Sequence, residues 1–117
     1  SGTKNKGKSK TTGMKTITTF ELQKLLTGKN TIQLIDQRTS REYDNGHIDG
    51  AIHYFKDDLE AIPDGLKKEV PVIIYCIYGI KSKGTAEVLS NAGFDVTVLE
   101  GGVYQWKKDI DKSLFIL

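Results

Sequence analysis

Cysteine and histidine are scarce in this chain of 117 residues, which has one cysteine, Cys76, and two histidines. A single cysteine cannot form an internal disulfide bond, and three such side chains make a zinc site of several Cys and His ligands hard to assemble. No apolar run approaches the roughly 20 residues that a membrane-spanning helix needs. These absences indicate a soluble domain of a reducing compartment, the cytoplasm, with no structural metal.

Acidic residues are absent from the first 15 positions, which contain five lysines. Removing these five from the 17 Lys and Arg leaves 12 basic against 15 acidic side chains in the other 102 residues, a formal charge of −3. Nucleic-acid binding needs clustered Lys and Arg that face phosphates. The charge distribution therefore argues against a nucleic-acid partner for the body of the protein.

The chain is expected to have three parts. Residues 1–14 are nearly devoid of apolar side chains and are expected to form a disordered basic tail. This tail is either a tag remnant before a natural start at Met14 or a linker that follows a removed membrane anchor. Only the second alternative would bring the protein to a membrane. Residues 15–112 are long enough for one folded domain, and residues 113–117 form a C-terminal extension.

Strand and helix patterns alternate from residue 15 onward. We expect strands at 15–18, 31–36, 51–53, 72–76 and 96–99, and helices up to residue 26 and at 40–45, 82–92 and 103–108, with a helical turn at 57–62. Thr18 with Glu21, and Thr39 with Glu42, have the spacing of capping boxes. The uninterrupted apolar run at 72–76 is typical of a central strand covered on both faces. The pattern predicts a three-layer α/β/α fold with a five-stranded, mainly parallel sheet.

Cys76 ends this most apolar strand, and ligands of parallel sheets bind at that end of the strands. The loop that follows leads into the helix at 82–92 and consists of Ile77, Tyr78, Gly79, Ile80, Lys81 and Ser82. A helix N-terminus and inward-pointing N–H groups stabilise a thiolate, the nucleophilic form of cysteine. Gly79 would allow the loop to curl, and Lys81 would add a positive charge. The site would suit a small anion or a soft sulfur species, although an inert buried cysteine is an alternative that these residues leave open.

Three separate segments, together covering about residues 16–108, carry motifs of one known family. The first, Asp36-Gln37-Arg38 through Glu42-Tyr43 and then Gly46-His47-Ile48-Asp49-Gly50-Ala51, resembles the D-x-R-x-x-x-E-[FY]-x-x-G-H-I-x-G-A signature of the rhodanese family, the sulfurtransferase homology domain. The second, Tyr75-Cys76-x-x-Gly79-x-Lys81-Ser82, resembles its active-site loop. The third, Leu99-Glu100-Gly101-Gly102-Val103-x-x-Trp106, resembles its C-terminal element. The resemblance implies a single rhodanese-like domain over residues 15–112.

The resemblance also implies sulfur transfer. In this family the cysteine equivalent to Cys76 takes a sulfane sulfur from a donor such as thiosulfate or a persulfide, holds it as a persulfide, and passes it to a thiol or cyanide. Neither a cofactor nor a metal is needed. The implied activity is that of a thiosulfate or persulfide sulfurtransferase, with Cys76 as the nucleophile, residues 77–82 as the substrate-binding loop, and a small sulfur donor or a protein persulfide as the partner.

Two loop positions depart from the family pattern. Many users of thiosulfate carry Arg directly after the cysteine and again at the sixth loop position, where this chain has Ile77 and Lys81. Lysine lacks the planar fork with which arginine grips an oxyanion, so a persulfide is expected to be a better donor than thiosulfate. With Ile77, Tyr78 and Ile80 the loop rim is unusually apolar, which suits either a hydrophobic donor or protein partner, or packing against neighbouring loops.

The remaining motif residues are expected to have structural roles. A carboxylate–guanidinium contact among Asp36, Arg38 and Glu42 would fix the loop that follows the strand at 31–36, in preference to contacting substrate. A related phosphatase would need arginine in a C-x5-R arrangement, and that position is Ser82. The main alternative to sulfur transfer is a non-catalytic rhodanese module for partner binding or redox sensing.

Overall fold

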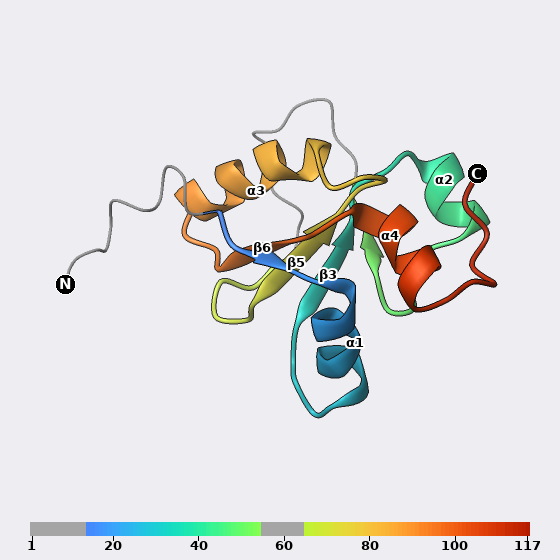
Figure 1. Ribbon diagram of the computed structural model, residues 1–117. Coiled ribbons are helices and arrows are strands. Elements are labelled where there is room, and N and C mark those ends of the chain that lie inside the picture. Colours follow the sequence, from blue (N-terminus) through green and yellow to red (C-terminus); the bar gives the residue numbers. More distant parts are fainter. Residues whose placement is uncertain (1–13, 55–64) are drawn as a thin grey trace.

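The computed structural model describes residues 14–54 and 65–117 (Figure 1). Residues 1–13 of the basic tail predicted over residues 1–14, and the helical turn predicted at 57–62, lie outside the described residues. Among the described residues, no helix is both long enough and apolar enough to cross a membrane.

A five-stranded, fully parallel sheet forms the centre of the domain (Figure 1). The strand order is β2-β6-β5-β3-β4, with β5 in the middle, as its uninterrupted apolar sequence predicted. The strands are β2 (Thr16–Ile17), β3 (Gln33–Asp36), β4 (Ile52–His53), β5 (Val72–Tyr75) and β6 (Val96–Leu99). Pairing between β3 and β5 begins at Gln33 opposite Val72. Pro71, the residue before β5, has no N–H to extend the ladder, and β3 is shorter than predicted at that end.

Helices cover both faces of the sheet, which confirms the three-layer prediction (Figure 1). They are α1 (Thr19–Thr27), α2 (Ser40–Asn45), α3 (Lys81–Asn91) and α4 (Gly102–Asp109). Alternate side chains of a strand point to opposite faces, so each strand contributes to two apolar clusters. Ile35 and Ile74 pack with Leu89 of α3 on one face. Ile73 packs with Leu22 of α1 and Trp106 of α4 on the other.

Both predicted capping boxes are present. The Thr18 hydroxyl accepts a hydrogen bond from the Glu21 amide at 3.1 Å, and the Thr18 amide donates to the Glu21 carboxylate at 2.9 Å. Thr39 and Glu42 make the same reciprocal pair at 3.2 and 2.9 Å. The second box starts α2 within a few residues of the end of β3, which brings Glu42 to the edge of the sheet where β5 also ends.

Candidate active site

The loop after β5 curls around the sulfur of Cys76. Sγ accepts hydrogen bonds from the backbone amides of Gly79 at 3.3 Å and Ser82 at 3.4 Å. The thiol donates to the Ser82 hydroxyl, also at 3.4 Å. Gly79 has a φ of +86°, a conformation that side-chain-bearing residues rarely adopt. The arrangement directs two N–H groups at the sulfur, and the Ser82 hydroxyl becomes a third donor once the thiol loses its proton.

The Gly101-Gly102 turn holds this loop from the other side. The amides of Val103 and Tyr104 donate hydrogen bonds to the carbonyls of Cys76 and Ile77, at 2.9 and 3.1 Å. A Cβ atom on Gly102 would lie 2.5 Å from the Cys76 carbonyl oxygen, so only glycine allows this approach. The first residues of α4 therefore fix the main chain on which the cysteine is mounted.

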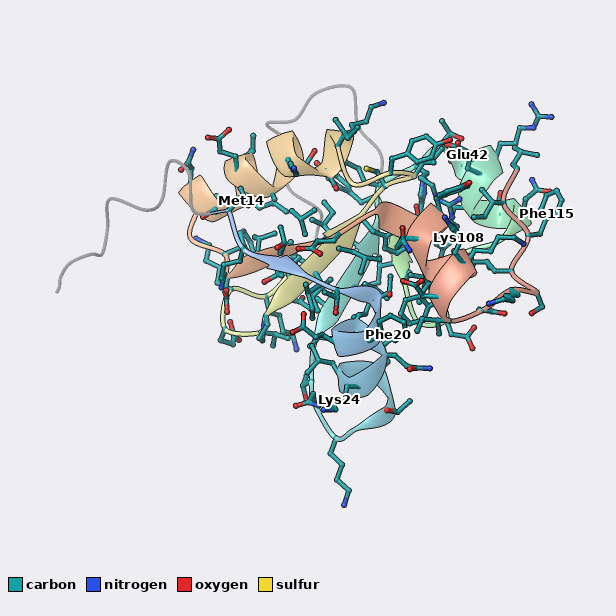
Figure 2. The ribbon with its side chains drawn as sticks, viewed as in Figure 1. Met14, Phe20, Lys24, Glu42, Lys108 and Phe115 are labelled. Carbon is teal, nitrogen blue, oxygen red and sulfur yellow. The ribbon has the colours of Figure 1, made fainter. Side chains whose placement is uncertain are left out.

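A pocket of about 520 Å³ opens beside the cysteine loop. Cys76 lines this pocket although its exposed fraction is 5%. One wall is the loop itself and the opposite wall is the segment between β3 and α2. The lining residues are Gln37, Arg38, Thr39, Glu42, Cys76, Ile77, Tyr78, Ile80 and Lys81. Figure 2 places Glu42 on the first turn of α2. A small donor could thus contact the thiol with little water around it.

A buried ion pair supports the wall opposite the loop, as predicted for this motif. Arg38 Nη2 lies 2.6 Å from Asp36 Oδ2, and both side chains are almost completely buried. Nη2 also donates to the Gly46 carbonyl at 2.6 Å, and the Tyr75 hydroxyl donates to Asp36 at 2.6 Å. Burial alone would lower the pKa of Arg38, but the hydrogen bond and charge of Asp36 outweigh it and raise the pKa. Arg38 is therefore a permanent cation whose charge is balanced by Asp36.

Glu42 and Lys81 bring one further charge of each sign to the pocket. Burial tends to raise the pKa of Glu42, whereas hydrogen bonds from Thr39 and the charges of Arg38 and Lys81 lower it below 4.5. Glu42 is ionised at neutral pH. Glu42 was predicted to support the loop, and the structure also places it in the lining of the pocket.

Two further lining residues were not identified from the sequence, Gln37 and Thr39. Gln37 is 2% exposed and donates through Nε2 to the Thr85 hydroxyl. Its Oε1 atom, and Nη1 of Arg38, are buried atoms that have no hydrogen-bond partner among the described residues. The only signal for Gln37 is its place directly after β3, at the ligand-binding end of the sheet.

The apolar rim residues differ in exposure. Tyr78 is 60% exposed and Ile80 is 75% exposed, whereas Ile77 is half-buried and lines the pocket. Tyr78 contacts Tyr104 of α4 edge to face, with ring centroids 5.4 Å apart. Tyr78 is thus partly packed against α4, while Ile80 extends into solvent. Among residues 14–54 and 65–117, no group of three His, Cys, Asp or Glu side chains could hold a metal ion.

Comparison with known proteins agrees with this geometry. The model of the rhodanese-like domain family matches residues 18–109. A thiosulfate sulfurtransferase GlpE from Shewanella oneidensis is 33% identical over 82 residues, which are 69% of this chain and 81% of that protein. Its namesake from Coxiella burnetii is 36% identical over 83 residues, 70% of this chain and 78% of that protein. The crystal structure of a rhodanese-like domain protein from Staphylococcus aureus has a TM-score of 0.72 and 34% identity, and the match covers 89% of this chain and 99% of that one. The chain belongs to the rhodanese-like domain family.

Proposed function

We propose that this protein is a sulfurtransferase that carries a sulfane sulfur on Cys76 as a persulfide. The observation that carries the proposal is the set of two amides and one hydroxyl around Sγ, in a pocket open to a small donor. Relatives named thiosulfate sulfurtransferase support the same reaction class. The single cysteine supports a reducing compartment, and we place the protein in the cytoplasm.

In the first half-reaction the Cys76 thiolate attacks the outer sulfur of the donor. A bond forms between Sγ and that sulfur while the sulfur–sulfur bond of the donor breaks, and its electron pair leaves with sulfite or with a thiolate. The amides of Gly79 and Ser82 stabilise the sulfur anion before attack. The same N–H groups remain close to the persulfide that forms.

In the second half-reaction an acceptor, a thiol or cyanide, attacks the outer sulfur of the Cys76 persulfide. The bond to Sγ breaks, and its electron pair restores the Cys76 thiolate. The enzyme therefore alternates between two covalent states, and no step requires an external oxidant or reductant. A cofactor has no part in this sequence.

Persulfide donors are expected to react better than thiosulfate. The cations that line the pocket are Arg38, whose charge is balanced by Asp36, and Lys81, whose charge acts on the carboxylate of Glu42. Thiosulfate carries two negative charges and would meet no net positive charge. An organic persulfide would place its carbon skeleton against Ile77 and the other apolar rim side chains.

The second candidate function is a binding or redox-sensing module. The exposed Tyr78 and Ile80 beside the thiol favour it, because exposed apolar side chains at a rim are typical of a protein contact. In this case the Cys76 sulfur would be oxidised or covered by the partner and would not turn over.

Intact-mass spectrometry distinguishes the two functions. The protein is incubated with thiosulfate and, separately, with cysteine persulfide, and peptide mapping then locates any adduct of one sulfur atom. We expect the adduct on Cys76, its loss on adding a thiol acceptor, and no adduct in the Cys76→Ser variant, whose side chain is a far weaker nucleophile. A folded protein that accepts sulfur from neither donor contradicts the sulfurtransferase proposal and favours the binding module.

A further inference from the structure

The pocket beside Cys76 has an unusual charge pattern for a site that would bind a simple anion. Glu42 contributes a carboxylate to its lining, and Oε1 of this group is engaged in the capping box with Thr39. The other carboxylate oxygen, Oε2, takes no part in that box. Lys81 lines the same pocket, and its charge acts on Glu42. The pocket therefore presents a negative and a positive group side by side.

Neighbouring buried atoms repeat this pairing of acceptor and donor. Gln37 Oε1 is an acceptor and Arg38 Nη1 is a charged donor, and both are buried without a partner among the described residues. Their residues line the pocket next to Glu42. Both atoms are enclosed by the protein, so the charged groups that a ligand can reach are the carboxylate of Glu42 and the ammonium group of Lys81. A donor that carries both an ammonium group and a carboxylate complements these two groups, whereas a sulfonate oxygen has no hydrogen to give to Glu42.

We propose that this pocket selects amino-acid persulfides, such as the persulfide of free cysteine, and that Glu42 is the specificity residue that binds the donor's ammonium group. Lys81 would receive the carboxylate. The inference rests on the proposed sulfur transfer at Cys76. The Cys76 thiolate forms a bond to the outer, protonated sulfur of the donor, and the donor's sulfur–sulfur bond breaks. The electron pair leaves on the thiolate of cysteine, which takes a proton from water.

Glu42→Gln is the decisive variant, because glutamine also serves at the third position of a capping box and removes only the negative charge. Its matched control is Glu87→Gln, since Glu87 is exposed on α3 and does not line the pocket. Each protein is mixed with cysteine persulfide, with N-acetylcysteine persulfide, which lacks the ammonium group, and with thiosulfate. The rate of sulfur loading on Cys76 is measured by rapid quenching and intact-mass spectrometry.

For each protein, the loading rate with cysteine persulfide is divided by the rate with its N-acetyl form. We expect this ratio to be about fivefold larger in the native protein and in Glu87→Gln than in Glu42→Gln, which is the effect of one partly exposed ion pair. Loading from thiosulfate should rise by about fivefold in Glu42→Gln, since a carboxylate that repels the dianion is removed. Taking the ratio of the two persulfides within each protein cancels their different intrinsic reactivities.

Equal donor ratios in the native protein and Glu42→Gln overturn the inference while leaving sulfur transfer intact. Failure of all three donors to load the native protein instead contradicts the proposed function itself. If Glu42→Gln fails to fold by circular dichroism, the methyl ester of cysteine persulfide is compared with the free acid and the N-acetyl form on the native protein. Each rate is divided by the rate of the same compound with a free thiol. If the N-acetyl form, which lacks the ammonium group, then loads Cys76 faster than the ester, the inference is overturned.

Discussion

The amide of Val103 donates a 2.9 Å hydrogen bond to the carbonyl of Cys76, so the start of α4 holds the backbone of the candidate nucleophile. This contact joins two segments that are 27 positions apart in the sequence. It exists because Gly102 has a φ of +64° and no side chain, which allows the turn to pass directly beneath the loop. The C-terminal glycine motif therefore acts on the site through the main chain.

Replacing Gly102 with alanine should damage the loop. Its Cβ would lie 2.3 Å from the Ile77 carbonyl oxygen, and backbone atoms cannot rotate aside as a side-chain tip can. Together with the positive φ, we expect the free energy of unfolding to fall by roughly 3 kcal/mol and sulfur loading to fall by more than tenfold. Urea unfolding and the loading rate measure the two effects.

Gly50→Ala is the control for the backbone conformation alone. Gly50 has a similar φ of +88°, but nothing lies within 4 Å of its added Cβ. This variant should lose about 1 kcal/mol of stability and keep its loading rate. Equal losses of stability and rate in the two variants would contradict the importance of the close approach at Gly102.

The buried pair Asp36–Arg38 provides a second stability prediction. Asp36→Asn leaves the Arg38 guanidinium buried without a compensating charge, and the free energy of unfolding should fall by about 3–5 kcal/mol. Tyr75→Phe removes a hydroxyl that donates to Asp36 and accepts from the Ile48 amide, but it leaves the ion pair in place. This loss should be smaller, about 1–3 kcal/mol. Urea denaturation ranks the two, and a larger loss for Tyr75→Phe would contradict this account.

The fold was predictable because its signals are local. The spacing of Thr39 and Glu42 specifies one helix start, and the uninterrupted apolar segment of β5 specifies a strand with both faces covered. The Asp36–Arg38 contact was predictable for the same reason, since the residues are two positions apart at a strand end. Glycine identity likewise indicated the curl of the cysteine loop at Gly79.

The rest of the site depends on contacts that a single sequence does not encode locally. Gln37 lies opposite Thr85 only because α3 packs over the end of β3, a contact across 48 positions. Within α3, Ala86 is fully buried, whereas the larger Val88 is only half-buried. The hydrogen bonds between Cys76 and Ser82 tie the first turn of α3 to the cysteine loop, a tertiary contact that the helical pattern does not contain.

Glu42 should make stability depend on pH in a defined direction. Its pKa in the folded protein is below 4.5, so the ionised group stabilises the fold above its unfolded pKa, and this contribution disappears as the pH falls through the folded value. We expect native protein and Glu42→Gln to differ by less than about 1 kcal/mol at pH 7 and to converge below pH 4.5. Urea midpoints across this range test it, and a difference that grows on acidification would contradict the sign.

Ser82 offers the most specific test of how the sulfur is stabilised. Its hydroxyl lies 3.4 Å from Sγ, and its amide donates to the same atom, so one residue supplies two of the contacts around the sulfur. Ser82→Ala removes only the hydroxyl. A hydrogen bond to a charged group contributes roughly 1.5 kcal/mol, so loading of Cys76 should slow by about tenfold. The amides of Gly79 and residue 82 remain, and the reaction should still be measurable.

The control is Ser90→Ala, because Ser90 is exposed on α3, and this variant should leave the rate unchanged. A Ser82→Ala protein as fast as the native one would mean that the two amides alone stabilise the sulfur anion.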